Sequence, residues 1–203
     1  MSSVEAVDDH YENHFGGKPD LMISLDLRWT TELTNYDYED LAALFDSEYE
    51  EGWGKWSPKT GYGYARGELH ALARSRGQLL GYAATARRFI GVGRKEVLIA
   101  GTGGVITRKD SRGTGVGRQV LAALQEANRE FAPADFGFLG CREAVVPFYE
   151  ACGYARLHKL TKDVSPQDAM TVIRSNGPTM ICAGTKPISS WPDGTIDLRG
   201  LPW

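Results

Sequence analysis

Apolar and polar residues alternate along several short segments of the chain, and this period of two is typical of β-strands. Residues 23–29 show it first, and two further runs, 70–73 and 79–89, are separated by the turn residues 75–77. Two runs joined by so short a turn predict a β-hairpin. The whole pattern predicts strands at 23–29, 70–73, 79–89, 97–107, 134–140, 154–160 and 179–183. A turn at 91–93 precedes the strand 97–107.

Other segments carry apolar residues three or four positions apart, which is the spacing of one helix face. Asp37 can cap a helix that begins near Tyr38. A second helix is predicted over residues 116–131, and a short third one over 145–152, where Gly153 ends it. The order of the elements, a strand meander followed by strand–turn–helix–strand–helix, predicts an α/β fold: a mixed sheet with helices on both faces.

The length of 203 residues fits one large domain, which we expect to cover residues 21–203. Residues 1–20 are acidic and polar, and they lack the basic start and the apolar stretch of a signal peptide. We interpret them as a flexible N-terminal leader. No apolar run reaches the roughly 20 residues that a membrane-spanning helix needs, so no membrane partner is expected.

Charge and cysteine content narrow the classes of function. The net charge of −3 argues against nucleic acid as a partner, because nucleic-acid-binding domains carry a basic surface. The three cysteines form no CxxC pair and the four histidines have no ligand spacing, which argues against a disulfide framework or a metal site. His70 is interpreted as a structural residue at the start of a strand. We therefore expect a cytoplasmic protein that binds no metal.

Three alternate glycines, Gly113, Gly115 and Gly117, lie between a predicted strand and the predicted helix 116–131. Glycines let the backbone take conformations closed to other residues and let a ligand come close. The N–H groups at the start of a helix bind an anion such as a pyrophosphate, helped by the helix dipole. The phosphate-binding set predicted here is Arg112, Gly113, Thr114, Gly115, Val116, Gly117 and Arg118.

Two other phosphate-binding turns do not fit this segment. A P-loop needs Lys and then Ser or Thr after its last glycine, but Arg118 and Gln119 follow here. A dinucleotide-binding GxGxxG turn has a different spacing and follows the first strand of its domain. A glycine-rich helix entry that binds nothing stays open as an alternative on this segment alone.

Two motifs together resemble those of the GCN5-related N-acetyltransferase superfamily. The first is RGTGVG at 112–117, which resembles its acyl-CoA pyrophosphate signature, Arg-x-x-Gly-x-Gly. The second is FYEACGY at 148–154, which resembles its second signature, with a predicted strand between the two. The likeness covers roughly residues 69–160. It implies a twisted mixed sheet, splayed between its fourth and fifth strands, with acetyl-CoA as the co-substrate in the split.

Two narrower resemblances concern the acceptor. HAL at 70–72, GYAA at 81–84, RRFI at 87–90 and an aromatic end at Trp203 are similar to aminoglycoside 2′-N-acetyltransferases, the kasugamycin-acetylating branch among them. RRFIGVG at 87–93 and WPDGTI at 191–196 are similar to nodulation N-acyltransferases, which acylate an amine of a chitooligosaccharide. Both resemblances imply an amino-sugar acceptor.

We therefore expect an N-acetyltransferase that acts on an amino group of an aminoglycoside-type amino sugar and confers antibiotic resistance by acetylation. The transfer would be direct, through a ternary complex. A nodulation-type acyltransferase, which would need a wider acyl tunnel and an acyl-carrier partner, stays open. A non-catalytic acyl-CoA-binding module and an enzyme acting on a protein or peptide N-terminus stay open as well. Because similar enzymes often dimerise, the resemblance also brings a homodimer into consideration.

The chain departs from the aminoglycoside enzymes at three positions. Gly103 stands where their fourth strand offers a glutamate as candidate base, and Leu201 stands where they carry an aspartate near the end of the chain. Arg142 replaces an asparagine often found before the second signature. The residue that takes the proton of the acceptor amine is therefore the least defined part of the predicted site.

Acyl transfer to an amine needs a base, a donor to the carbonyl oxygen and a proton for the departing thiolate. We expect Tyr149 to be the general acid, and a backbone N–H of Ile106 or Thr107 to support the carbonyl. The terminal carboxylate of Trp203 is the first candidate base, because the tail of similar enzymes folds back to the acceptor. The other candidates are Asp197, Glu143 and bulk water.

Flat aromatic side chains and carboxylates together suit a cationic sugar. Trp53 and Trp56 lie in a glycine-rich segment without clear period, close to Glu51. We expect these three residues, with Asp197, to bind the acceptor. The alternative is that the aromatic residues anchor a long loop and that the carboxylate is a solvated helix end.

Overall fold

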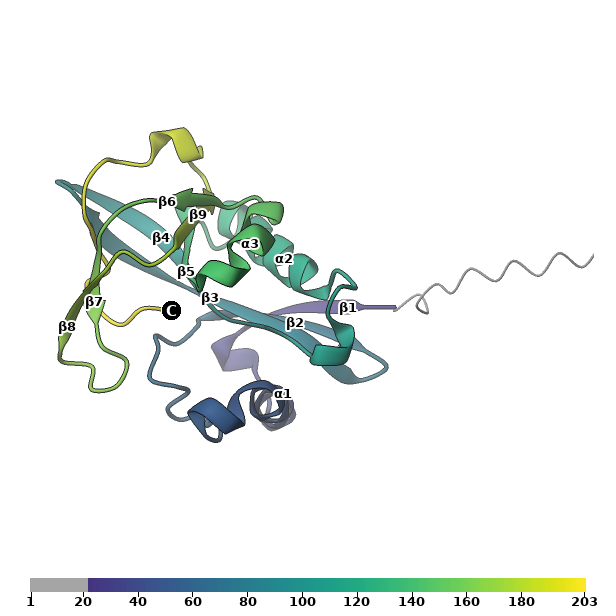
Figure 1. Cartoon of the computed structure of the whole chain (residues 1–203). Helices are drawn as coiled ribbons and strands as arrows, with labels where there is room; N and C mark the ends of the chain where they lie inside the picture. The colour runs from purple at the N-terminus through teal and green to yellow at the C-terminus, as the bar shows by residue number, and fades with distance from the viewer. Residues whose placement is uncertain (1–21) are drawn as a thin grey trace, which may run out of the picture.

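The computed structural model describes residues 22–203, and the expected leader, 1–20, lies outside them (Figure 1). A ten-stranded mixed sheet runs through the described residues, with the order β6-β9-β5-β4-β3-β10-β7-β8; off this path, β2 pairs with β3 and β1 pairs with β2. The strands are β1 (Ser24–Trp29), β2 (Leu69–Ser75), β3 (Gln78–Val92), β4 (Lys95–Thr107), β5 (Phe136–Gly140), β6 (Ala155–Leu157), β7 (Thr161–Val164), β8 (Val172–Ser175), β9 (Thr179–Ala183) and β10 (Ile196–Asp197), and the α-helices are α1 (Asn35–Trp53), α2 (Val116–Glu130) and α3 (Val146–Ala151).

The antiparallel strands β2, β3 and β4 form the centre of the sheet. Arg76 and Gly77, with φ of 49° and 79°, turn the chain from β2 into β3, which confirms the predicted hairpin. The next turn comes later than the predicted 91–93, because β3 pairs with β4 as far as Val92 and Lys95. The long ends of β3 and β4 therefore reach well beyond the helices (Figure 1).

The parallel pairing between β4 and β5 is short. It joins Ile99–Gly101 to Phe136–Phe138, whereas β4 continues to Thr107 and β5 to Gly140. Past Gly101 the two strands separate, and β4 loses its partner on that edge. This is the split between the fourth and fifth strands that the resemblance implies.

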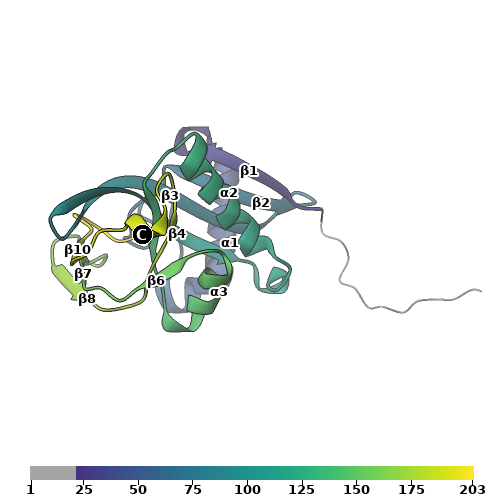
Figure 2. The same ribbon diagram turned by 90° about the horizontal axis from the view of Figure 1, so that it is seen from above.

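Helices cover both faces of the sheet, as predicted (Figures 1 and 2). On one face, α1 buries Leu41, Leu44 and Phe45 in a cluster with side chains of β2, β3 and β4. On the other face, α2 presents an apolar stripe, including Val120 and Leu124, to side chains of β2 and β3. The sheet thus positions α1 and the α2–α3 pair on opposite sides of the split.

The start of α1 differs from the sequence prediction by about one turn. Thr34, not Asp37, is the N-cap: its hydroxyl accepts from the Asp37 N–H, while the Asp37 carboxylate accepts from the Thr34 N–H at 2.8 Å. Asp37 therefore closes a capping box from the third position of the helix. Its carboxylate also pairs with Arg28 and Arg74, at 2.9 and 2.8 Å.

Three strands of the last part of the chain were not predicted. β7 and β8 form a hairpin of partly exposed residues, and the two-residue β10 pairs parallel with β7 and antiparallel with β3. Conversely, the predicted strand 154–160 shrinks to β6, because residues 158–160 leave the sheet before β7 begins. Within the described residues, no helix is both long and apolar enough to cross a membrane.

Candidate active site

A cavity of about 1530 Å³ opens where β4 and β5 separate. Residues from the turn before α2, from α3 and from the ends of β4 and β5 line one part of it. α1, the segment between α1 and β2, and the strands β2 and β3 line the rest. The cavity therefore joins both faces of the sheet through the split, and a donor and an acceptor can meet there from opposite sides.

The turn before α2 is open and uncapped. Gly113 and Gly115 have φ of 76° and 89°, and a Cβ added at Gly113 would meet nothing within 4 Å. Gly115 is the N-cap of α2, and no side chain caps the helix there. The first N–H groups of this 15-residue helix are thus free to bind an anion. These features fit a pyrophosphate, as the sequence predicted.

Gly117 links the two signature motifs. A Cβ at this position would lie 3.0 Å from the Thr107 hydroxyl and 3.2 Å from the ring of Phe148. A larger residue would therefore push α2 away from β4 and from α3. The close packing explains why a glycine stands here, next to the first turn of α2.

Arg112 contributes to the turn through contacts within the chain. Its guanidinium pairs with the carboxylate of Glu48 on α1, and its Nε donates to the Thr107 carbonyl at 3.2 Å. The same carboxylate accepts from the N–H of Lys109 at 3.0 Å. Arg112 thus fixes the turn against α1 and β4, and the N–H groups of α2 with Arg118 are left to face a phosphate.

We expect Gly115→Val to weaken CoA binding. A β-branched residue at a φ of 89° is strained, and relieving this strain would redirect the N–H groups of the first turn of α2. A strain of 1–3 kcal/mol predicts a loss of affinity of about tenfold or more. Calorimetric titration with CoA measures it; Gly177→Val, at a glycine with open space and without positive φ, is the control and should bind as the wild type does. Equal affinity in both variants would contradict the assignment of this turn.

Tyr149 lies in α3 and lines the cavity with a side chain that is 8% exposed. Its ring packs edge-to-face on Phe148 and Tyr154, with centroids 5.1 and 5.8 Å apart. Burial, and then the neighbouring Cys141, raise the pKa of Tyr149 above its ordinary value. The hydroxyl therefore keeps its proton at neutral pH and can donate it, as a general acid must.

The two backbone donors predicted on β4 point in different directions. Ile106 is paired with Tyr82 on β3, and the N–H of Arg108 donates to the Leu80 carbonyl at 2.8 Å. Because hydrogen bonding alternates along an antiparallel strand, the N–H of Ile106 faces β3 and that of Thr107 faces the split. Of the two, Thr107 is the one placed to reach a carbonyl oxygen in the cavity.

Trp203 lies over glycines of β4 at the split. A Cβ at Gly101 would overlap its indole ring, and a Cβ at Gly103 would lie 2.9 Å from its backbone carbonyl carbon. The position where the aminoglycoside enzymes carry a glutamate is therefore occupied by the backbone of Trp203. The indole also meets the edge of Phe138 on β5, at 6.5 Å between centroids.

The tail that carries Trp203 is held firmly. Arg88 donates to the carbonyls of Leu198 and Leu201, at 3.0 and 2.8 Å, and its guanidinium lies 4.1 Å from the centre of the Trp203 ring. The N–H of Ala65 donates to the Pro202 carbonyl at 2.8 Å. The last residues thus form a wall of the cavity.

The predicted acceptor residues of the aromatic segment line the cavity together. Trp53 is half exposed, whereas Trp56 stacks on Phe45 with centroids 5.3 Å apart. Glu51 lines the same wall near Trp53. Trp56 therefore anchors the segment, and Trp53 and Glu51 are the members of the set that a ligand can reach.

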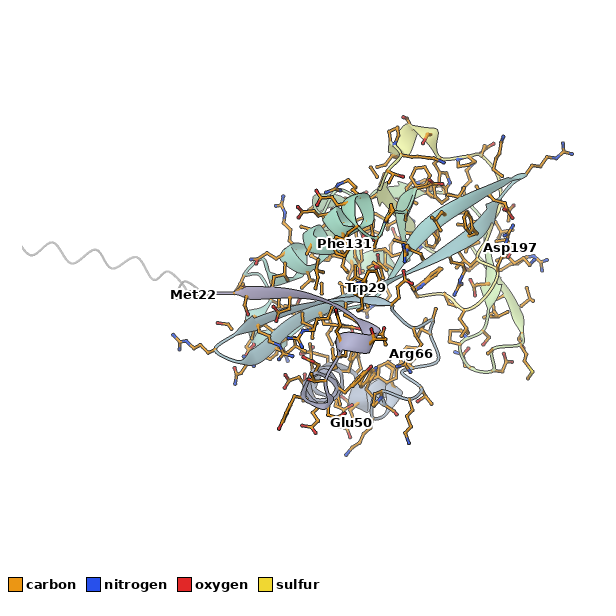
Figure 3. The ribbon with its side chains drawn as sticks, turned by 180° about the vertical axis from the view of Figure 1, so that it is seen from behind. Met22, Trp29, Glu50, Arg66, Phe131 and Asp197 are labelled. Atoms are coloured by element: carbon orange, nitrogen blue, oxygen red, sulfur yellow. The ribbon has the colours of Figure 1, made fainter. Side chains whose placement is uncertain are left out.

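Asp197 and Glu143 do not join these residues. The carboxylate of Asp197 accepts from Lys162 at 2.7 Å and from the Arg199 N–H at 3.0 Å, on the side of β10 that lies apart from Arg66 and Glu50 (Figure 3). Glu143 forms an ion pair with Arg156. Neither residue lines the cavity, since each carboxylate is held by a basic partner elsewhere. The structure therefore does not bring Asp197 or Glu143 together with the other predicted site residues.

Comparison with known proteins assigns the family. A sequence model of Nodulation protein A (NodA) matches residues 21–201, which include nearly every wall of the cavity. The chain belongs to the NodA family. Nodulation protein A of Azorhizobium caulinodans is 27% identical over 186 residues, covering 86% of this chain and 81% of the relative. That of Rhizobium meliloti is 24% identical, covering 88% and 96%.

Solved structures share the fold of this NodA-family chain. The GNAT family N-acetyltransferase YhbS of Escherichia coli, in complex with CoA, has a TM-score of 0.61 over 90% of this chain and 92% of its own, at 15% identity. An acyl-CoA N-acyltransferase from Pseudomonas aeruginosa has a TM-score of 0.53 over 79% and 99%, at 18% identity. The predicted GCN5-related acetyltransferase fold is confirmed, and family and fold together support an N-acyltransferase enzyme.

The NodA match favours the nodulation resemblance over the aminoglycoside one. The motifs at 70–72 and 81–84, which carried the aminoglycoside resemblance, consist of buried residues in the centre of the sheet. Three of these residues, His70, Tyr82 and Ala84, also line the cavity, so the motifs by themselves do not distinguish one acceptor from another, whereas the NodA match over residues 21–201 does favour the nodulation resemblance. The expectations of an aminoglycoside substrate and of antibiotic resistance therefore gain no support.

Sequence reasoning missed two residues that line the cavity of this NodA-family protein, His70 and Tyr82. His70 was interpreted as structural, and Tyr82 was named only as part of the motif at 81–84, with no role in the site. A signal was available: two polar side chains on neighbouring strands, in stretches that are otherwise apolar. Their partnership across β2 and β3 depends on the register, which the sequence pattern does not define to one residue.

Proposed function

We propose that the chain transfers an acyl group from acyl-CoA to the free amine of an amino-sugar oligosaccharide of the chitooligosaccharide type. The observation that carries the proposal is the NodA match over residues 21–201, because it covers donor and acceptor sides of the cavity alike. The uncapped start of α2 supports CoA as the carrier of the acyl group.

The transfer we propose is direct. The amine attacks the thioester carbonyl, and the Thr107 N–H stabilises the charge that develops on the oxygen. Tyr149 then donates its proton to the departing thiolate. No covalent enzyme intermediate is needed, because the cavity can hold donor and acceptor together at the split.

The composition of the acceptor side supports an amino sugar. Trp53 and Tyr64 are exposed aromatic residues whose ring centroids lie 6.1 Å apart, and both line the cavity. Flat aromatic surfaces suit a sugar ring, and the carboxylate of Glu51 on the same wall suits a cationic amine.

A second, smaller cavity supports an acyl chain longer than acetyl. Its volume is about 210 Å³, and Phe138, Leu198 and Pro178 are among the apolar residues that line it. It shares four lining residues with the main cavity, so the two meet beside Trp203 at the split. We propose that the end of the acyl chain enters it. The shared residues are Gly140, Cys141, Pro202 and Trp203.

Gly177→Phe should shorten the preferred acyl chain. Gly177 lines the second cavity, and a Cβ there meets nothing within 4 Å, so the ring can enter without strain. Excluding two methylenes at about 0.8 kcal/mol each predicts about a tenfold fall in kcat/KM for a long-chain donor relative to acetyl-CoA. Gly52→Phe, on the far wall of the main cavity, is the control and should leave this ratio unchanged. An unchanged ratio in Gly177→Phe would contradict the path of the chain.

The proposed acceptor is tested by competition. Purified protein with one acyl-CoA is given a chitooligosaccharide carrying one free amine and an aminoglycoside in turn, and thiol release is followed for each. A higher kcat/KM for the chitooligosaccharide supports the proposal. A higher kcat/KM for the aminoglycoside would restore the acceptor expected from the sequence and overturn this one.

A further inference from the structure

We propose that Tyr82 takes the proton of the acceptor amine and that His70 takes the hydroxyl proton of Tyr82 in return. Both residues line the main cavity, Tyr82 from β3 and His70 from β2. The proposal rests on the proposed function, since it supplies the base that direct transfer to an amine requires. Asp197 and Glu143 are held by basic partners outside the cavity, whereas Tyr82 and His70 line it, as does Trp203.

A chain of hydrogen bonds connects the pair to the backbone. The Tyr82 hydroxyl lies 2.8 Å from His70 Nδ1, and His70 Nε2 lies 2.9 Å from the Thr30 hydroxyl. The Thr30 hydroxyl donates to the Gly67 carbonyl at 3.0 Å. Both ring nitrogens of the buried His70 therefore have a hydrogen-bond partner.

The Thr30 hydroxyl lies 3.0 and 3.3 Å from the carbonyls of Gly67 and Glu68, which can only accept. We assign its single proton to these carbonyls, so that Thr30 accepts from His70 Nε2 and His70 Nδ1 is left as an acceptor. The Tyr82 hydroxyl consequently donates to Nδ1. Its proton points at His70, and toward the cavity the Tyr82 oxygen presents lone pairs, which can accept an N–H.

The surroundings keep the pair in this state. Burial, and then the charge of Arg66, lower the pKa of His70 to about 4, so the imidazole is neutral at pH 7. Burial raises the pKa of Tyr82. The charge of Arg66 lowers this pKa, and the neighbouring Tyr38 raises it. Arg66 itself donates to the Lys59 carbonyl at 2.9 Å, on the segment beside α1 that Figure 3 shows.

Tyr82 stands next to the irregular part of β4. The β3–β4 register shifts between Tyr82 and Ala84, and Gly104 opposite the shift has a φ of 63°. A Cβ at Gly104 would lie 2.9 Å from the Tyr82 ring, so a glycine there lets β4 pack directly against this buried ring. The same stretch of β4 leads to Thr107, the donor assigned to the thioester carbonyl.

The proton transfer balances. As the amine nitrogen bonds to the thioester carbon, its N–H bond breaks and an O–H bond forms on Tyr82. The original O–H bond of Tyr82 breaks and an N–H bond forms on His70 Nδ1, which becomes an imidazolium and later releases the proton to water. A weak base suffices, because bond formation to carbon makes the amine nitrogen strongly acidic.

Three variants test the pair. Tyr82→Phe removes the accepting oxygen, His70→Asn keeps an acceptor for Tyr82 but cannot bind the proton, and Tyr36→Phe removes a hydroxyl from an exposed position of α1 outside the cavity as a control. We expect kcat for amine acylation to fall about 100-fold or more in the first two, the usual contribution of a general base, with acyl-CoA affinity unchanged. The rate of Tyr82→Phe should then rise with pH, as hydroxide replaces the lost base, while Tyr36→Phe behaves as the wild type does.

The possible results distinguish a failure of the Tyr82–His70 pair from a failure of the proposed acceptor. If the wild type acylates a chitooligosaccharide amine and both variants retain kcat within about threefold, the pair is overturned and the function stands. If the wild type acylates a simple primary amine but no amino sugar, and Tyr82→Phe abolishes that reaction, the pair stands and the acceptor is overturned. Loss in His70→Ala with full activity in His70→Asn would show that His70 orients Tyr82 without taking its proton, which would contradict the proposed relay.

Discussion

Tyr149→Phe is expected to lower kcat for acyl transfer by about 100- to 1000-fold, within the range that general acid catalysis contributes. The substitution removes one hydroxyl from a ring that Phe148 and Tyr154 hold in place, so the cavity and the affinity for acyl-CoA should not change. Without this proton donor, the thiolate must depart as an anion. Steady-state thiol release with acyl-CoA and a saturating amine measures the effect.

A control and a rescue sharpen this prediction. Tyr49→Phe removes a hydroxyl from α1 on the opposite wall of the same cavity and should change kcat by less than about threefold. A thioester of a more acidic thiol should restore most of the rate of Tyr149→Phe, since that thiolate needs no proton to leave. Equal losses in both variants, or no rescue, would mean that Tyr149 has a packing role instead.

Asp37→Asn is expected to lower the free energy of unfolding by about 3 kcal/mol, because removing one partner leaves buried charges uncompensated. The Asp37 carboxylate is 5% exposed and faces both Arg28 and Arg74 while closing the capping box of α1. Asp40→Asn, at a carboxylate that is 41% exposed and also pairs with Arg74, is the matched control, with an expected loss below about 1 kcal/mol. Urea denaturation of the three proteins measures the differences.

The contribution of Asp37 to the free energy of unfolding depends on pH in a defined direction. Burial would raise the pKa of this carboxyl, but hydrogen bonds from Thr34 and the charges of Arg28 and Arg74 outweigh it and lower the pKa. The stabilisation is therefore complete above the ordinary aspartate pKa of about 3.9 and is lost as the pH falls through the lowered folded value. The difference between wild type and Asp37→Asn should shrink in that acidic window. A difference that stays constant down to pH 2 would contradict the assignment.

Strong local periodicity made most of the sheet and the long helices predictable. The alternation at 23–29 became β1, whose Leu27 and Trp29 are partly buried against the core, and the helical stripe over 116–131 became α2, whose stripe is buried. The first turn of α1 was misplaced although Thr34 and Asp37 form a capping-box pattern. Two residues each suited the N-cap, and tertiary contacts of Asp37 with Arg28 and Arg74 decided between them.

Features that depend on distant partners could not be predicted. β10 has only two residues and forms because β3 and β7 lie on either side of it. No local sequence pattern therefore predicts it. The same holds for the site. The turn before α2 is a local motif and was found, whereas the pairing of His70 with Tyr82 requires the register of β2 against β3.

The base expected from the sequence shows the same limit. The terminal carboxylate of Trp203 was the first candidate because the tail of similar enzymes folds back to the acceptor, and the structure does bring the backbone of Trp203 onto Gly103. What the sequence could not show is that Arg88 holds the tail from 110 and 113 residues away in the chain, at the carbonyls of Leu198 and Leu201. A wall built in this way depends on contacts between segments far apart in sequence.

The most direct test of the central claim is the mass of the reaction product. A chitooligosaccharide with one free amine is incubated with a medium-chain acyl-CoA and the protein, and the oligosaccharide is analysed by mass spectrometry. We expect a gain of one acyl group, located on the amine by fragmentation and absent with Tyr149→Phe over the same time. An oligosaccharide of unchanged mass, while the protein binds the acyl-CoA tightly, would contradict the claim that this NodA-family chain acylates amino sugars.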